Sequence, residues 1–321
     1  MVQSRAFRLL GLFFLLSSSV SAQQDPEFTQ FMFNKMYYNP AYAGVEGITQ
    51  FNLLVRSKWT GYASTFDGAG GAPNTQVFTM NSPIYKIKSG FGAYLINDNL
   101  GNLNNLSFQG SYAYHFNIKE GKLSLGVNAG FFSQSIDFSQ YRPSDPDDPL
   151  LIDKGGKETE TKFDMGAGAF YQAKKFYVSA SVSHLVSPSF NFGIENLYNA
   201  LEPTLFVMGG YHYEVSYNLI ITPSLMVQSD FKKTLINFGA IASFNEKFWG
   251  GITYKYQESA ALILGMSLLK SKALEVGYGF DYIIHDQEAK QPTSHEIRLG
   301  YSLPVSSFGG KKVIRTPRFR H

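Results

Sequence analysis

Acidic side chains gather in one proline-containing segment of the chain. Asp145, Asp147, Asp148 and Asp153 lie within nine residues of one another. Carboxylates at such close spacing can ligate Ca²⁺. The segment lacks the glycine and the distal glutamate of an EF-hand loop, and its prolines favour rigid turns. We therefore expect a solvated acidic loop, and a calcium site is the alternative.

No other set of residues has the spacing of a catalytic or metal site. The six histidines are scattered, and the absence of cysteine excludes disulfides and thiolate metal sites. The sequence has no Gly-x-Ser-x-Gly signature and no Walker or dinucleotide-binding motif. We expect neither an enzyme nor a cofactor-binding protein. A serine, histidine and aspartate set inside a barrel lumen stays an alternative.

The first 22 residues have the pattern of a secretory signal peptide. A positively charged start is followed by a short apolar run that ends at Leu16, and Val20 and Ala22 are the small residues that a signal peptidase reads. The apolar run is far shorter than the ~20 residues that span a membrane, which argues against the alternative of an N-terminal anchor. We expect residues 1–22 to be removed and the mature chain to begin at Gln23.

Between residues 48 and 303 the sequence alternates apolar and polar residues with a period of two, which predicts β-strands. Leu125 and Val127, for example, would face one side of a sheet, and Ser124 and Asn128 the other. About fourteen such segments have the length of a tilted membrane strand. They are 48–58, 74–83, 88–98, 104–117, 122–137, 161–172, 175–186, 202–215, 218–229, 232–244, 247–256, 259–269, 272–284 and 294–303.

The predicted connections between these segments alternate in length. All connections after even-numbered segments are tight, whereas the long ones, 58–73, 138–160, 187–201 and 285–293, follow odd-numbered segments. An outer-membrane barrel has short periplasmic turns, long outer loops and an even number of strands, with both termini in the periplasm. A soluble β-sandwich, the alternative, has no reason to sort its loops in this way. We therefore predict an all-β transmembrane antiparallel barrel of about fourteen strands (residues 48–303) in the outer membrane.

The composition agrees with a protein that faces lipid. Charged residues are 17% of the chain, against roughly 25% in soluble domains, and the net charge of +3 is too small to indicate nucleic-acid binding. Aromatic residues, 16% of the chain, recur near both predicted ends of the strands, as in the aromatic girdles of membrane barrels. One predicted girdle contains Tyr114, Phe116, Tyr213, Phe244, Phe248 and Trp249, and the other contains Tyr254, Tyr256 and Tyr282.

Several charged residues occur on the polar faces of the predicted strands. A lysine or arginine on the lipid face at mid-depth would cost about 2–4 kcal/mol, so we expect these side chains to face the lumen. We interpret them as lumen wall and not as a catalytic set. The predicted wall residues are Arg56, Lys255, Glu275, Asp281, Glu296 and Arg298, together with Asp164.

Residues 23–47 differ from the strands that follow. Their aromatic residues show no period of two, and Pro26 and Pro40 remove backbone donors that a central strand needs. The segment is nevertheless too apolar to lie free in water. We predict that it plugs the barrel lumen, with Asn39-Pro40-Ala41 turning the chain toward the first strand. The predicted plug residues are Phe31, Phe33, Asn39, Pro40, Ala41 and Gly44.

The same N-terminal residues carry a resemblance to a known family. The run 24–34 (QDPEFTQFMFN), followed by Asn-Pro-Ala-Tyr-Ala-Gly at 39–44, closely resembles the mature N-terminus of the PorP/SprF family. Trp59-Thr60-Gly61, Gly71-Ala72-Pro73, Phe248-Trp249-Gly250 and Ser294-His295-Glu296-Ile297 resemble further family motifs in the same order. The family usually has Trp-x-Gly and Gly-Ala-Pro closer together, so residues 62–70 resemble a loop insertion. The resemblance extends over essentially the whole mature chain.

The resemblance implies an outer-membrane accessory protein of the type IX secretion and gliding apparatus of Bacteroidetes. Family members support the secretion or surface retention of adhesins through their C-terminal domains, or assembly with periplasmic components. We therefore expect outer-membrane lipid, an adhesin C-terminal domain and periplasmic machinery as partners. The Asn-Pro-Ala element also resembles the N-terminal hatch of FadL-type channels, so a channel for a small hydrophobic or amphipathic solute is the alternative function.

The partner-facing residues are expected in the outer loops. Trp59, Gly71, Ala72, Pro73, Asp145, Asp147 and Asp148 are the candidates. An exposed tryptophan is a frequent interface anchor, although Trp59 could instead belong to an aromatic girdle. Residues 304–321 form a basic tail that we expect in the periplasm, where it would contact acidic partners or remain disordered.

Overall fold

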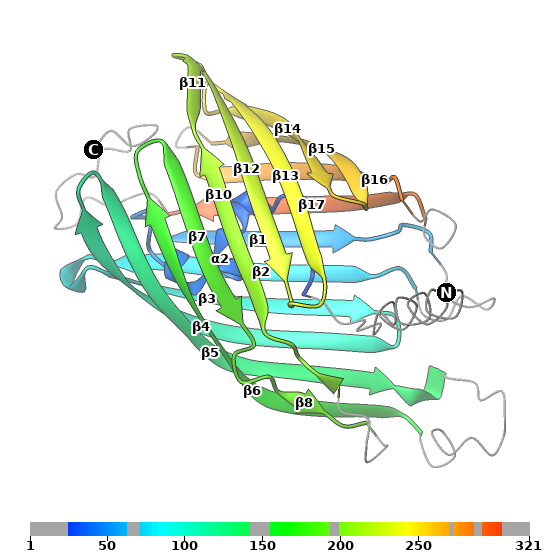
Figure 1. Ribbon diagram of the computed structural model, residues 1–321. Coiled ribbons are helices and arrows are strands. Elements are labelled where there is room, and N and C mark those ends of the chain that lie inside the picture. Colours follow the sequence, from blue (N-terminus) through cyan, green and yellow to red (C-terminus); the bar gives the residue numbers. More distant parts are fainter. Residues whose placement is uncertain are drawn as a thin grey trace, which may run out of the picture.

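The computed structural model describes residues 25–62, 71–140, 155–192, 199–269, 272–285 and 291–303. The wall is a closed antiparallel barrel of 14 strands, as predicted (Figure 1). β1 pairs with β17, and β10 pairs with both β7 and β12. None of the helices in the described ranges is long and apolar enough to cross a membrane.

The wall strands agree with the segments predicted from the alternation. They are β1 (Gln50–Ser57), β2 (Asn74–Ile84), β3 (Ser89–Leu100), β4 (Leu103–Ile118), β5 (Gly121–Asp137), β6 (Lys157–Gln172), β7 (Phe176–Ser183), β10 (Thr204–Tyr211) continued by β11 (Tyr213–Ser216), β12 (Leu219–Ser229), β13 (Thr234–Phe244), β14 (Phe248–Lys255), β15 (Ser259–Leu268), β16 (Leu274–Ile283) and β17 (Thr293–Ser302). A separate short hairpin is formed by β8 (Ser189–Phe190) and β9 (Asn199–Ala200).

Two strand boundaries differ from the prediction by more than two residues. β6 begins at Lys157 and not at residue 161, because the polar run Lys-Glu-Thr-Glu-Thr pairs with the end of β5 although it has no apolar alternation. β7 ends at Ser183 and not at residue 186. His184 has a φ of 57°, a left-handed conformation that cannot continue a strand.

The two faces of the wall are inverted relative to a soluble protein. On β5, Leu125 and Val127 point outward and are 49% and 53% exposed, whereas Ser124 and Asn128 point inward and are buried. A surface with this apolar alternation needs a lipid solvent, because exposing such a band to water would be costly. The outward face is therefore the membrane face, and the inward face lines the lumen.

Most of the predicted girdle aromatics lie on the outward face, but Trp249 does not. Phe248 is exposed on β14, and the next residue, Trp249, therefore points inward and is 8% exposed. Its ring lies over Gly265 and Gly277, where an added Cβ would come within 2.0 Å and 2.6 Å of the indole. The prediction that Trp249 belongs to a girdle is wrong, because the strand period turns it into the lumen.

The connections sort by length between the two ends of the barrel (Figure 1). One end of the barrel carries the turns after β2, β4, β6, β11, β13 and β15, and none of these turns is longer than the one at 269–273. We name it the tight-turn end. The opposite, long-loop end carries the connections 58–73, 138–156 and 184–203. β1 starts and β17 ends at the tight-turn end.

The N-terminal segment lies inside the barrel and forms a large part of its core together with inward-facing wall residues (Figure 1, dark blue). It contains three short helical turns, η1 (Phe31–Phe33), α2 (Lys35–Tyr38) and η2 (Pro40–Tyr42). Asp25 lies next to His184, just beyond the long-loop end of β7, and Gly44 lies against Gly90 at the tight-turn end of β3. The segment therefore runs along the lumen before it enters β1.

This path bears on one prediction about the chain ends. The sequence predicts that both termini lie in the periplasm. Asp25 lies toward the long-loop end, and because residues 1–24 lie outside the described residues, the placement of the N-terminus stays a prediction. The chain first crosses the lumen and only then starts β1, which the strand count alone does not reveal. Ser302, the last residue of β17, is at the tight-turn end as predicted. Residues 1–24 and 304–321, which include the predicted leader and tail, lie outside the described residues.

Candidate functional site

The Asn-Pro-Ala element is a helix start that also attaches the segment to the wall. Asn39 is the N-cap of η2: its Oδ1 accepts a hydrogen bond from the Ala41 N–H at 2.8 Å, and Pro40 occupies the first helical position. The Asn39 side-chain amide donates to the carbonyl oxygens of Ala169 on β6 and Ala180 on β7, at 3.0 Å and 3.2 Å. One side chain thus satisfies the turn and fixes it to two strands.

The turn around Asn39-Pro40-Ala41 packs against inward-facing glycines of the wall. A Cβ added at Gly126 on β5 would lie 2.5 Å from the Ala41 Cα, and one added at Gly90 on β3 would lie 2.0 Å from the Ala43 carbonyl oxygen. Both contacts are to backbone, which cannot swing away as a side chain can. The absence of a side chain at these positions lets two backbones approach directly.

The aromatic residues of the segment lie against different strands around the lumen. Tyr37 packs on Tyr94 of β3 with ring centroids 5.3 Å apart, and Tyr38 packs on Phe206 of β10 at 5.4 Å. Phe33 packs on Trp249 at 4.6 Å. This radial arrangement explains why the aromatic spacing has no period of two, because the aromatic side chains of the segment point toward wall strands on several sides.

Four of the predicted wall residues form one charged group inside the barrel. We name Arg56 (β1), Lys255 (β14), Asp281 (β16) and Glu296 (β17) the charged quartet. Arg56 Nη2 lies 2.7 Å and Lys255 Nζ 3.3 Å from Asp281 Oδ2, and Arg56 Nη1 lies 3.5 Å from Glu296 Oε2. All four side chains are at most 3% exposed. Two cations and two anions balance, as burial of charge requires.

The charged quartet also binds the backbone of the N-terminal segment. The N–H groups of Thr29 and Gln30 donate to the two carboxylate oxygens of Glu296, both at 2.8 Å. Arg56 Nη1 donates to the Glu27 carbonyl oxygen at 2.7 Å. The Thr29 hydroxyl donates to Asp281. The quartet is therefore an anchor for residues 27–30 as well as part of the wall.

Two further predicted wall residues form a second pair closer to the tight-turn end. Arg298 Nη2 lies 2.6 Å from Glu275 Oε2, and Arg298 Nε donates to Asn52 Oδ1 at 2.8 Å. The guanidinium stacks on the Phe33 ring, with Cζ 4.3 Å from the centroid. The structure thus places these six residues inside the barrel in two groups, and the seventh predicted wall residue, Asp164, belongs to a third group.

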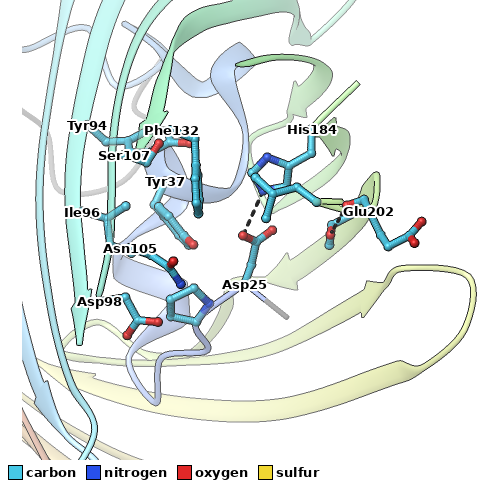
Figure 2. Close-up of a pocket in the computed structure, with 13 residues that line it drawn as sticks. Asp25, Tyr37, Tyr94, Ile96, Asp98, Asn105, Ser107, Phe132, His184 and Glu202 are labelled. Atoms are coloured by element: carbon cyan, nitrogen blue, oxygen red, sulfur yellow. Dashed lines mark hydrogen bonds and ion pairs between the residues drawn. The ribbon is translucent and has the colours of Figure 1, made fainter. Parts of the chain in front are cut away.

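A third polar group, of which the sequence predicted only Asp164 as lumen wall, holds Asp25, the first described residue. His184 lies between Asp164 on β6, with Nδ1 2.8 Å from its Oδ2, and Asp25, with Nε2 3.0 Å from its Oδ1. Figure 2 shows the contact between His184 and Asp25. Burial alone would lower the pKa of His184, but the charges and hydrogen bonds of the two aspartates outweigh it and raise the pKa to about 10. The imidazolium therefore links the segment to the wall at neutral pH.

A cavity of about 40 Å³ adjoins this group (Figure 2). Tyr37, Tyr94, Asp98 and Phe132 are among its lining residues, and Leu201 and Glu202 cover it from the connection after β9. The volume is enough for water but not for an organic substrate. The described residues contain no cluster of three or more histidine, aspartate or glutamate side chains arranged to hold a metal ion.

The predicted partner-facing residues are only partly described. Trp59 follows β1 with a φ of 53°, its N–H donates to Ser294 Oγ at 3.0 Å, and its ring contacts Tyr62. Gly71 is exposed, and the carbonyl of Pro73 accepts a hydrogen bond from the Lys58 N–H. Asp145, Asp147 and Asp148 lie outside the described residues. Trp59 stays a prediction both as a girdle residue and as a partner anchor.

The comparison with known families decides the affiliation of this barrel. The family model of the type IX secretion system membrane protein PorP/SprF matches residues 20–301. The chain belongs to the PorP/SprF family. The match contains the N-terminal segment and all wall strands, apart from the last residue of β17. The predicted resemblance is confirmed, and the protein is an outer-membrane component of the type IX secretion system.

Two solved structures that resemble this PorP/SprF protein are monoaromatic hydrocarbon channels. The deltaS2S3 mutant of TodX, a monoaromatic hydrocarbon channel, has a TM-score of 0.52 at 10% identity, over 83% of this chain and 93% of the TodX chain. The CymD monoaromatic hydrocarbon channel has a TM-score of 0.50 at 12% identity, over 84% of this chain and 91% of CymD. At such identities the likeness shows the FadL-like barrel fold alone. No curated protein matches the sequence.

Proposed function

We propose that this PorP/SprF protein is a docking subunit of the secretion apparatus whose outer loops bind the C-terminal domain of an exported adhesin and hold it at the cell surface. The observation that supports the proposal is the N-terminal segment packed against the wall inside the barrel. A barrel that fixes its own chain in its lumen through the charged quartet and Asn39 is built as a rigid platform. Such a platform needs neither an open pore nor an enzymatic site.

The orientation that supports docking follows from the lengths of the connections. Outer-membrane barrels turn tightly on the periplasmic side and carry their long loops outside. We therefore place the long-loop end, with Trp59 and Pro73, at the cell surface, and the tight-turn end, with Ser302, in the periplasm. The surface loops would meet the exported adhesin, and the periplasmic turns would meet the machinery.

Co-purification and loop exchange test the docking function. The adhesin C-terminal domain should co-purify with the barrel from detergent extracts in a fixed ratio, and replacement of the 58–73 connection by a short glycine-serine turn should release the adhesin from cells. A matched control replaces the 230–233 turn, which is already short. Adhesin retention that is unchanged by the first replacement would refute the proposal.

The alternative function is a channel for a small hydrophobic or amphipathic solute. The observation in its favour is the fold that this chain shares with monoaromatic hydrocarbon channels. Under this alternative, liposomes with the barrel would take up toluene, and a variant in which the N-terminal segment is cross-linked to the wall would stop uptake. Under the docking proposal, both preparations have the same low permeability. The two functions therefore differ in one measurement.

A further inference from the structure

The tight turns of this barrel carry an excess of lysine. The described residues of the six turns contain seven lysines, Lys86, Lys88, Lys119, Lys174, Lys175, Lys247 and Lys272, and two glutamates, Glu120 and Glu246. Lys174 pairs with Glu120 at 3.6 Å, and Lys272 pairs with Glu246 at 3.2 Å. The five other lysines are exposed and have no carboxylate partner among the described residues. We name these turns the basic rim.

The long-loop end has a different arrangement of charge in its described part. There, Lys58 pairs with Glu258 at 2.9 Å, and Lys232 pairs with Glu202 at 2.6 Å. Lysines at that end are therefore partly neutralised by the protein itself. Lysines that remain unpaired together on one rim produce a positive potential that attracts anionic partners.

A polar pocket of about 230 Å³ lies in the lumen at the same end. Gln50 of β1, Asn81 of β2 and Ser302 of β17, which pair with one another where these strands meet the tight-turn end, contribute to its lining. Lys35 of the N-terminal segment and Arg298 of the wall add two cations, and Glu46 and Glu275 add two carboxylates, of which Glu275 pairs with Arg298. The pocket is thus reached from the side that the basic rim surrounds.

Arg298 and Lys35 have binding capacity that the described residues do not use. Arg298 is 5% exposed, and its Nε and Nη2 are satisfied by Asn52 and Glu275, but its Nη1 is buried with no hydrogen-bond partner in the described part of the chain. A buried unpaired donor on a charged group is costly, and a carboxylate is its strongest partner. The Lys35 ammonium lies 4.1 Å above the Tyr177 ring and forms no ion pair within the described ranges.

We propose that the tight-turn end binds an acidic peptide segment of a partner protein, which lies across the basic rim and places one carboxylate in the pocket beside Arg298 and Lys35. The proposal rests on the proposed function only in placing this end in the periplasm. An extended peptide can contact the rim and enter the lumen. A phospholipid headgroup is tied to the leaflet outside the wall and cannot reach Arg298, so the pocket favours a peptide.

Peptide binding to the full mature chain in nanodiscs of uncharged lipid tests the proposal. The probe is a fluorescein-labelled peptide of alternating glutamate and serine, with a glutamine and serine peptide as its neutral counterpart. Fluorescence anisotropy should show binding of the acidic peptide alone, with an affinity that falls as salt rises. Equal binding of the two peptides would overturn the proposal.

Two sets of variants locate the bound peptide. The rim triple variant Lys86→Gln, Lys175→Gln and Lys247→Gln should weaken binding about tenfold, as expected for three exposed ion pairs. The control triple variant Lys157→Gln, Lys232→Gln and Lys233→Gln changes the net charge equally at the long-loop end and should leave the affinity within about twofold. An equal loss in both triples would show attraction by net charge alone and would refute a site at the rim.

The pocket is tested by Arg298→Gln and, independently, by Lys35→Gln. Each substitution should lower the affinity for the acidic peptide several-fold. If Arg298→Gln fails to give a heat-modifiable barrel, Lys35→Gln alone tests whether the pocket binds the carboxylate. Affinity unchanged in Lys35→Gln and in folded Arg298→Gln would overturn the pocket. Competition by phosphatidylglycerol vesicles that removes all peptide binding would identify a headgroup site instead. The rim triple should still co-purify with the adhesin domain, so its outcome is separate from that of the docking function.

Discussion

The N-terminal segment is attached to the wall at two charged groups, of which one binds mainly its backbone and the other binds the Asp25 side chain. At the charged quartet, the backbone N–H groups of Thr29 and Gln30 donate to Glu296, whose charge is balanced by Arg56. At the other group, only side chains meet: Asp25 contacts His184, and His184 contacts Asp164. The first anchor holds the segment through backbone N–H groups, to which the Thr29 hydroxyl adds one bond, whereas the second depends on the Asp25 side chain. The two anchors, at residue 25 and at residues 27–30, can therefore be loosened separately.

Removal of the carboxylate from the first anchor should have the largest effect on the segment. Glu296→Ala leaves two backbone donors unsatisfied and Arg56 with one counter-ion fewer, and breaking such a buried arrangement costs about 3–5 kcal/mol. Because the chain contains no cysteine, a single Met36→Cys substitution reports the position of the segment. Met36 is 2% exposed, so maleimide labelling should be slow in the parent and fast with Glu296→Ala.

The control for this variant is Glu160→Ala. Glu160 is a wall carboxylate of β6 that pairs with Lys162 and does not contact the N-terminal segment. Its removal should leave labelling at position 36 unchanged. Slow labelling in both variants would show that the quartet does not hold the segment, and the contrast between the two anchors would then be lost.

A steric change at the glycines should displace the segment by a smaller amount. Gly126→Ala adds a Cβ 2.5 Å from the Ala41 Cα, and overpacking of this kind costs about 1–3 kcal/mol. The matched control is Gly110→Ala on β4, where the nearest atom would be 3.9 Å away. Thermal unfolding, followed by the heat-modifiable gel shift, should show a lower unfolding temperature for Gly126→Ala only. A higher unfolding temperature in both variants, as expected for a simple glycine-to-alanine change in a strand, would contradict the direct backbone contact.

The fold was predictable because it depends on local patterns. A period of two and the parity of connection lengths require no knowledge of which strands meet, and they yielded fourteen strands and the two ends. The inward direction of Arg56, Lys255 and Glu296 also followed from strand alternation. The failure at Trp249 arose because the aromatic type was weighed above the alternation, although Phe248 already occupied the outward position.

The anchors were not predictable because they depend on strand register and chain path. The quartet joins β1, β14, β16 and β17, whose charged residues meet only after the barrel has closed. Asp25 and His184 are 159 residues apart, and the strand count alone does not reveal that the segment runs along the lumen. The one available signal was His184 itself, a polar residue where the apolar alternation of β7 stops.

Loss of the second anchor should release only the start of the segment. His184→Asn keeps a residue that tolerates the left-handed backbone but cannot bridge Asp25 and Asp164. Labelling at a Pro26→Cys position should become faster, whereas labelling at Met36→Cys should stay slow because the quartet is intact. Equal acceleration at both positions would show that the two anchors act as one unit.

A change of pH should have the smallest effect and separate the anchors without mutation. The pKa of His184 is raised in the folded protein to about 10, against about 6.5 in an unfolded chain, so its stabilisation is complete below about pH 6.5 and is lost as the pH rises through about 10. The first anchor uses the backbone N–H groups of Thr29 and Gln30, which do not titrate in this range, so their bonds to Glu296 are expected to hold. Between pH 7 and pH 10.5, hydrogen exchange of the amides near Asp25, corrected for its intrinsic pH dependence, should lose protection. The amides of Thr29 and Gln30 should keep their protection, and this difference should disappear in His184→Asn, whose second anchor is already lost at pH 7.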